Sequence, residues 1–241
     1  MRDVGVAIIC LMWIAAPLQS QETAEDVLNK AISAHGGAEN LRKSQSHKTK
    51  ISAKYYQGDK ATAHSIDCIT RLPGYDCAII STEGDSSVIK CIYKNGESVI
   101  ECNDKAILIS EGQQREKRMS VSISYLSTLL PLLDKSAYTL EIVGDPGAKA
   151  TTIGVKAFRD KHYIATLYFD RKRYLLNRID YLTLDDGDQV HKNELCYSEF
   201  KKSGGLLYPS TSELYRDGKI LGSVKIESKE IGIAVKDAED R

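Results

Sequence analysis

Residues 23–41, TAEDVLNKAISAHGGAENL, combine an amphipathic helix with an abrupt stop. Thr23 is a good N-cap residue, and the helix dipole favours the two carboxylates that follow it in the first turn. Gly36 can adopt the left-handed conformation that commonly follows a helix end. The stretch therefore predicts a first helix that ends at the glycine pair, with a further helical turn over residues 38–43. The apolar stripe of the first helix consists of Ala24, Val27, Leu28, Ala31, Ile32 and Ala34.

Beyond residue 46 the sequence changes to short β-rich segments separated by turn residues. A spacing of about 8 to 12 residues between turns favours an antiparallel meander over βαβ units. Asp217-Gly218 is the strongest turn signal, because Asp-Gly readily takes the positive φ values of a two-residue hairpin turn. The predicted strands span residues 46–56, 62–70, 75–81, 87–93, 97–102, 105–110, 137–143, 151–158, 161–169, 173–184, 190–202, 206–217 and 220–235.

A second helix is predicted between the two groups of strands. Four leucines between residues 126 and 133 recur at helical spacing, so we expect a helix over residues 119–133 with Pro131 in a distorted last turn. The mixed-charge run before it, residues 111–118, is expected to be a solvated approach to this helix.

Twelve or so antiparallel strands and two helical segments predict a mainly β, α+β fold. A single sheet of that size does not stay flat, because strands twist. We therefore expect a large curved antiparallel sheet, an open half-barrel, with the helices covering its concave face.

The first 20 residues are typical of a signal peptide. Arg2 precedes an apolar run over residues 4–16, and Pro17 then breaks the pattern. Such a run is shorter than the roughly 20 residues that a membrane-spanning helix needs. We expect cleavage after residue 20, export to the periplasm or the extracellular space, and a single mature domain over residues 21–241 without a transmembrane anchor.

Export would permit disulfides, and five cysteines remain after the signal peptide. Cys68 and Cys77 flank one predicted turn, and Cys91 and Cys102 flank another, so both pairs could face one another across hairpins. The alternative, of equal weight, is that these four and Cys196 are small buried residues. None forms a CxxC motif, which argues against a metal site.

The sequence contains no constellation that indicates an enzyme. The five histidines are dispersed, no serine lies in a G-x-S-x-G motif, and Gly36-Gly37 lacks the lysine of a P-loop. Asp185-Asp-Gly-Asp188 lacks the distal glutamate of an EF-hand, which favours a solvated hairpin turn over a calcium loop. An exposed turn is likewise favoured over an anion site at residues 171–173. We expect no catalytic residues, no cofactor and no metal.

Charge argues against nucleic acid as a partner. Lys plus Arg and Asp plus Glu both number 33, and the basic residues are scattered along the chain. No broad positive field is available to attract a polyanion.

Four segments, taken in order, resemble one family. They are VLNKAISAHGGAENLRKSQS (27–46), LLPLLD (129–134), TLYFDRKRYLLNRIDY (166–181) and CYSEFKKSGGLLYPSTSELYRDGKILGSVKIESKEI (196–231). Together they resemble bacterial periplasmic lipoprotein carriers of the LolA/LolB-like superfamily over about residues 23–233. No arginine here matches a ligand-contacting arginine of the characterised carriers, and the cysteines are not a family feature.

The resemblance implies an open β-barrel whose apolar cavity, covered by helices, holds a lipid or lipoprotein acyl chains without catalysis. We therefore expect an exported carrier or binding protein for an apolar ligand. The alternative is a structural or interaction protein of the cell envelope, with a filled core and an envelope protein as its partner. The candidates for cavity or lid, which periodicity alone would assign to the core, are Val27, Leu28, Ala31, Ile32, Leu126, Leu129, Leu130 and Leu133.

Overall fold

The computed structural model describes residues 22–144 and 151–233. The expected signal peptide lies outside the described residues, as do the last two residues of the strand expected over residues 220–235. The helices are α1 (Ala24–Ala34), α2 (Ala38–Ser44) and α3 (Glu111–Leu126), with a short 3₁₀ helix, η1 (Leu130–Leu133).

Helix α1 begins at the predicted N-cap. The Thr23 hydroxyl accepts a hydrogen bond from the Asp26 amide (3.2 Å), and the Asp26 carboxylate accepts one from the Thr23 amide (3.0 Å). This reciprocal capping box satisfies amides at the helix start. The helix ends before Gly36 and Gly37, whose φ values are 104° and 88°. The predicted first helix and the helical turn after it, here α2, are confirmed.

The helix predicted over residues 119–133 is wrong at both ends. Helix α3 begins directly after Ser110, whose hydroxyl accepts from the Gln113 amide (3.1 Å) while the Gln113 side chain accepts from the Ser110 amide (2.8 Å). The charged run 111–118 therefore forms the first turns of the helix, because it contacts a polar hairpin rather than the apolar core. At the other end, Leu129 takes a left-handed conformation (φ 65°) that interrupts the helical repeat before η1.

The strands follow the predicted order. They are β1 (Ser46–Gln57), β2 (Lys60–Arg71), β3 (Tyr75–Thr82), β4 (Val88–Lys94), β5 (Glu97–Cys102), β6 (Lys105–Ile107), β7 (Thr139–Val143), β8 (Thr152–Arg159), β9 (His162–Asp170), β10 (Leu176–Leu184), β11 (Val190–Ser203), β12 (Leu206–Arg216) and β13 (Lys219–Ile231). Residues 171–173 form an exposed turn between β9 and β10.

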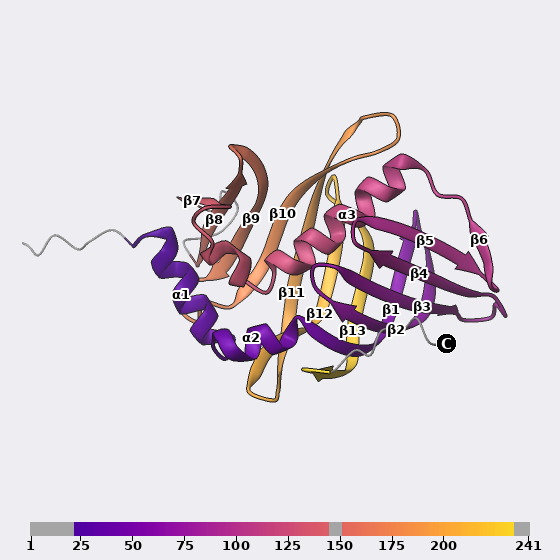
Figure 1. Ribbon diagram of the computed structural model, residues 1–241, viewed down its shortest axis with the longest axis horizontal. Coiled ribbons are helices and arrows are strands. Elements are labelled where there is room, and N and C mark those ends of the chain that lie inside the picture. The colour runs from indigo at the N-terminus through magenta and orange to yellow at the C-terminus, as the bar shows by residue number, and fades with distance from the viewer. Residues whose placement is uncertain (1–21, 145–150, 234–241) are drawn as a thin grey trace, which may run out of the picture.

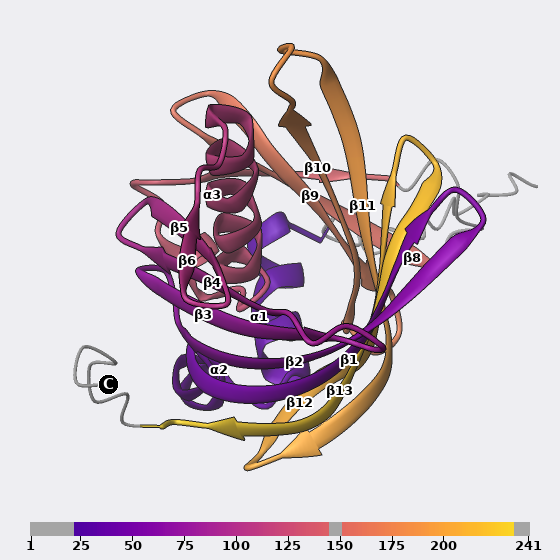
Figure 2. The ribbon, with the colours of Figure 1, turned by 90° about the vertical axis from the view of Figure 1, so that its right-hand side faces the viewer.

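All 13 strands form one antiparallel sheet, in the order β6-β5-β4-β3-β2-β1-β13-β12-β11-β10-β9-β8-β7. Two meanders, β1–β6 and β7–β13, therefore join where the first strand pairs with the last. The sheet is open, with β6 and β7 at its edges, and it curves around α3, with α1 and α2 on the same concave side (Figures 1 and 2). The predicted half-barrel with helices on its concave face is confirmed.

The apolar core lies between the helices and the second meander. Its fully buried members include Val27 and Leu28 of α1, Phe169 of β9 and Ile179 of β10. No residue of strands β1–β6 belongs to this core cluster. The concave face of the first meander therefore lies outside this cluster, although Ala53, Ile66 and Tyr93 on it are buried. Among the described helices, none is long and apolar enough to cross a membrane.

The five described cysteines are free thiols. Cys68 lies opposite Ala78 and Cys77 opposite Ile69, so these two cysteines point to opposite faces of the sheet. Cys91 lies opposite Ile100, two positions along from Cys102. The hairpin pairings that the sequence left open are therefore not formed. Of the five, Cys77 is buried and the others are half-buried.

Candidate functional site

A cavity of about 240 Å³ lies between the C-terminal half of α3, α2 and the middle of the sheet. Its sheet side comes from β1–β3 together with β12 and β13, where the two meanders join. Leucine side chains such as Leu41 and Leu206 share its wall with serine and threonine hydroxyls, two histidines, one aspartate and one lysine. The cavity is therefore amphiphilic rather than purely apolar.

The side of α3 that faces the cavity is made of small hydroxyl residues. Ser120, Ser124 and Ser127 line it at spacings of four and three residues, which places them on one helix face. The Ser127 and Thr128 hydroxyls donate to backbone carbonyls of α3 at 2.7 Å. Small side chains here keep α3 from filling the space beneath it.

Three ionisable groups of the sheet face this cavity from neighbouring strands. Asp76 accepts hydrogen bonds from the Lys117 ammonium (2.6 Å) and the Thr70 hydroxyl (2.8 Å). The His47 ring lies 2.7 Å from the Ser44 carbonyl, and burial together with the positive charge of Lys229 lowers its pKa to about 4. Burial lowers the pKa of Lys229 to about 8. At neutral pH the site therefore holds a neutral imidazole, an internally paired carboxylate and an ammonium.

A row of isoleucines continues from this cavity across the concave face of the first meander. Ile226 of β13 lines the cavity and lies opposite Ile51 of β1, which lies opposite Ile66 of β2. The row goes on through Ile80 of β3 to Ile89 of β4. Ile66 is buried and the other four are half-buried. We call these five residues the isoleucine row.

Val224, Ala53, His64 and Thr82 lie opposite one another in the next row of the sheet and continue the concave face beside the isoleucine row. A separate groove of about 570 Å³ lies on the convex side of the same strands, because most of its wall, such as Ser52, Ser65 and Lys225, alternates with these residues. The cavity and the isoleucine row thus follow one another along the concave face. An elongated ligand with an apolar body fits such a path.

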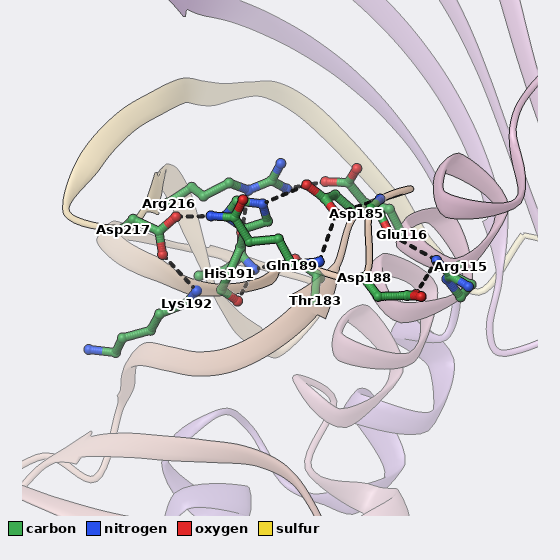
Figure 3. A network of polar contacts seen from close by, with 12 residues as sticks. Arg115, Glu116, Thr183, Asp185, Asp188, Gln189, His191, Lys192, Arg216 and Asp217 are labelled. Carbon is green, nitrogen blue, oxygen red and sulfur yellow. Dashed lines mark hydrogen bonds and ion pairs between the residues drawn. The ribbon is translucent and has the colours of Figure 1, made fainter.

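The first turns of α3 are fastened to the hairpin between β10 and β11. The Asp186 carboxylate accepts hydrogen bonds from the Gly112 amide and the Ser110 hydroxyl, both at 2.7 Å. Arg115 donates to the Asp185 carbonyl (2.8 Å) and pairs with Asp188 (3.2 Å), as Figure 3 shows. The sequence correctly predicts a hairpin turn over residues 185–188. One of its carboxylates, that of Asp186, bonds to the start of a helix, which the sequence did not indicate.

Replacing Asp186 by alanine tests this fastening. It removes two hydrogen bonds and a negative charge from the start of α3, so we expect a loss of about 1–2 kcal/mol in the free energy of unfolding. Asp188→Asn in the same turn is the control, because its side chain is 77% exposed and asparagine, like aspartate, tolerates the left-handed conformation there (φ 57°), so it should change stability by less than about 0.5 kcal/mol. Urea unfolding of the three proteins measures both values; equal effects would show that Asp186 does not hold α3.

His191 extends this polar network toward the turn between β12 and β13. Its Nδ1 lies 2.7 Å from an Asp217 carboxylate oxygen, and its Nε2 lies 3.3 Å from one of Asp185 (Figure 3). The hydrogen bonds to Asp217 and then to Asp185 raise the pKa of His191. Across residues 22–144 and 151–233, no group of three or more His, Cys, Asp or Glu residues is arranged to hold a metal ion.

Comparisons with known proteins identify the fold. No protein-family model matches the chain, and no curated protein matches its sequence. Among solved structures, a DUF1329 family protein from Desulfovibrio piger matches with a TM-score of 0.57 and 13% identity, over 90% of this chain and 97% of that chain. A LolA superfamily protein from Nitrosomonas europaea matches with a TM-score of 0.56 and 8% identity, over 86% and 93%. The chain has the LolA/LolB-like fold. A domain assigned to the outer membrane lipoprotein-sorting proteins, from Vibrio parahaemolyticus, matches with a TM-score of 0.53 and 7% identity, over 88% and 95%.

In this LolA/LolB-like fold, the residues predicted for cavity or lid lie mainly in the core. Six of the eight are buried members of the core cluster: Val27, Leu28, Ala31, Ile32, Leu126 and Leu129. Leu130 is partly buried and packs against that cluster. Leu28 and the exposed Leu133 line a separate groove of about 760 Å³ between α1 and η1. None of the eight lines the cavity beneath α3. Their part in ligand binding stays a prediction.

The residues that do line the cavity of this LolA/LolB-like fold were missed by sequence reasoning. The serine spacing over residues 120–127 is visible in the sequence, but it was masked by the stronger leucine repeat that follows. The isoleucine row combines residues from both meanders. Only the register between β1 and β13 reveals it.

Proposed function

We propose that this chain is an exported, non-enzymatic carrier or binding protein for an apolar ligand, a lipid or the acyl chains of a lipoprotein. The ligand would lie between the curved sheet and its covering helices. The isoleucine row supports this proposal, because its four members in the first meander place apolar side chains on a concave face outside the core cluster, while Ile226 packs against that cluster. Burying alkyl groups there is worth about 0.8 kcal/mol per CH₂ and needs no reactive group.

The fold supports the same proposal. Two of the similar structures are a LolA superfamily protein and a domain assigned to outer membrane lipoprotein sorting. We propose by analogy that residues 1–20 are a cleaved signal peptide and that residues 21–241 form one domain in the periplasm or outside the cell. An envelope protein that delivers or receives the ligand would be its partner. The function needs no cofactor, metal or nucleic acid.

The alternative is a structural or interaction protein of the envelope. The filled core between the helices and β8–β10 favours it, because the leucines of α3 and η1 already have packing partners there. The two functions differ in what the isoleucine row contacts. A carrier would cover it with ligand, and a structural protein would leave it without one.

Two adjacent isoleucines provide a matched test. Ile80 belongs to the isoleucine row, whereas Ile79 points from the same strand to the convex face and is 43% exposed. A carboxylate at position 80 would lie in the path of the ligand, so we expect Ile80→Glu to lose bound lipid and Ile79→Glu to keep it. Native mass spectrometry of each protein, purified from its own envelope, measures the lipid adduct, and circular dichroism confirms folding.

Binding of the neutral probe N-phenyl-1-naphthylamine provides an independent readout. We expect at least a tenfold weaker affinity in Ile80→Glu and an unchanged affinity in Ile79→Glu. A wild-type protein that carries no lipid and binds no probe would favour the structural alternative. Unchanged binding by folded Ile80→Glu would remove the isoleucine row from the site.

A further inference from the structure

A β-bulge directs Lys229 into the cavity beneath α3. Along β13, Ile226 and Lys229 both line the cavity although they are three residues apart, a spacing that would place them on opposite faces of a regular strand. The pairing shifts here: Ser228 lies opposite Lys50, while Ile226 lies opposite Ile51. The extra residue in β13 turns the lysine inward, and bulges commonly re-aim a side chain in this way next to functional sites.

The Lys229 ammonium has no anionic partner in the described part of the chain. It lies over the Tyr208 ring, whose centroid is 5.2 Å from Nζ. Asp76, the carboxylate on the cavity wall, is paired with Lys117 at 2.6 Å. His47 and His35 have lowered pKa values and add no positive charge at neutral pH. The cavity therefore presents one uncompensated positive charge.

Hydroxyl groups that can donate hydrogen bonds line the same cavity. The Ser120 and Ser124 hydroxyls of α3, which are exposed at the rim of the cavity, and the half-buried Ser212 hydroxyl of β12 have no hydrogen-bond partner within residues 22–144 and 151–233 and can donate to a ligand. Helical serines otherwise tend to bond to a carbonyl one turn back, as Ser127 does here. An ammonium and three unengaged hydroxyls form a donor-rich set that suits an oxyanion.

The position of this set determines which ligand it suits. Ile226 lines the cavity and is also the first member of the isoleucine row, so a charged head group beside Lys229 would lead its alkyl chain onto that row. We propose that the cavity beneath α3 binds the anionic head group of an amphiphile, a carboxylate or a phosphate, with Lys229 as its counter-ion. This inference rests on the proposed function, because the isoleucine row must receive the chain.

The test compares amphiphiles that share a dodecyl chain: dodecanoate, dodecyl phosphate and dodecanol. We expect wild-type protein to bind at least one of the two anions at least tenfold more tightly than the alcohol. Lys229→Met should remove that preference and leave the affinity for dodecanol unchanged, and Lys229→Arg should retain most of it. Lys225→Met, an exposed lysine of the same strand, is the control and should behave as wild type. Isothermal titration calorimetry below the critical micelle concentration measures each affinity.

The outcomes separate this inference from the function on which it rests. Wild-type protein that binds none of the three ligands contradicts the carrier function and this inference together. Equal affinity for the anions and the alcohol, or an anion preference that survives Lys229→Met, overturns the inference alone. Tighter binding of dodecyl phosphate than of dodecanoate would assign the head group to a phospholipid. Tighter binding of dodecanoate would assign it to a fatty acid.

The apo protein offers a second readout. A half-buried ammonium without an anionic partner costs stability, so ligand-free Lys229→Met should melt at a higher temperature than wild type. A raised melting temperature combined with lost anion preference would show that the fold retains this lysine for binding. A variant that melts at a lower temperature and loses dodecanol binding as well would assign Lys229 a structural role and overturn the inference.

Discussion

Lowering the pH from 7 to 4 is expected to cost about 3 kcal/mol of stability through His47 alone. Burial and the nearby Lys229 charge lower the pKa of His47 from about 6.5 to about 4. The unfolded chain therefore takes up a proton near pH 6.5, while the folded chain stays neutral down to about pH 4. A difference of about 2.5 pH units, at about 1.4 kcal/mol per unit, gives about 3.5 kcal/mol in full, of which about 3 kcal/mol is lost by pH 4, where half of the folded chains are protonated.

The sign follows from the depressed pKa. The contribution of His47 is fully present above pH 6.5 and is lost as the pH falls toward 4. His35 acts in the same direction, because burial lowers its pKa as well. Urea unfolding of wild type and His47→Gln at pH 7, 5.5 and 4 separates the contribution of His47 from those of the carboxylates and the other histidines. Parallel pH profiles for the two proteins would contradict the prediction.

Replacing Gly36 by alanine is expected to cost about 3 kcal/mol or more. Gly36 has a φ of 104°, and a Cβ atom there would lie 2.2 Å from the Gly205 carbonyl oxygen in the turn between β11 and β12. The turn is not free to move away from Gly36, because His35 makes two polar contacts with Leu207 at the start of β12. The His35 carbonyl accepts from the Leu207 amide (3.0 Å), and its ring Nδ1 lies 2.8 Å from the Leu207 carbonyl.

Gly37→Ala is a matched control for this prediction. Gly37 has a φ of 88° and would suffer similar backbone strain, but a Cβ atom there meets nothing within 4 Å. We expect it to cost only about 1–2 kcal/mol. The difference between the two variants in urea unfolding isolates the contact between α1 and the β11–β12 turn. Equal losses would mean that backbone strain alone accounts for the glycine pair.

Local signals in the sequence predicted most of the fold. The Thr23 capping box and the turn at residues 217–218 act over a few residues, so α1 and the strand order could be predicted without knowing what surrounds them. The start of α3 could not be predicted. Its first turns contact the hairpin through the Gly112 amide and the Arg115 side chain, and a helix held by polar contacts shows no apolar stripe.

The candidate site depends on long-range register, which the sequence does not display. Helical spacing alone assigned apolar residues such as Leu126 to the core, where they lie, and the cavity or lid role that the resemblance added stays a prediction. Ile51 and Ile226 are cross-strand neighbours only because β1 pairs with β13, a strand from the other end of the chain. Lys229 faces inward only because of an irregularity in that pairing, and a regular alternation would place it on the other face.

The pairing of β1 with β13 also has a consequence for how the protein reaches its folded state. The two strands lie about 180 residues apart, since Thr49 is opposite Lys229. Contacts of such long sequence separation slow folding, because the chain must close a large loop before they form. The last strand of the sheet follows every other strand in the chain, so β1 has an unpaired edge until β13 has been synthesised. An unpaired strand edge can pair with other chains, and a holding chaperone would protect the newly made protein during this interval.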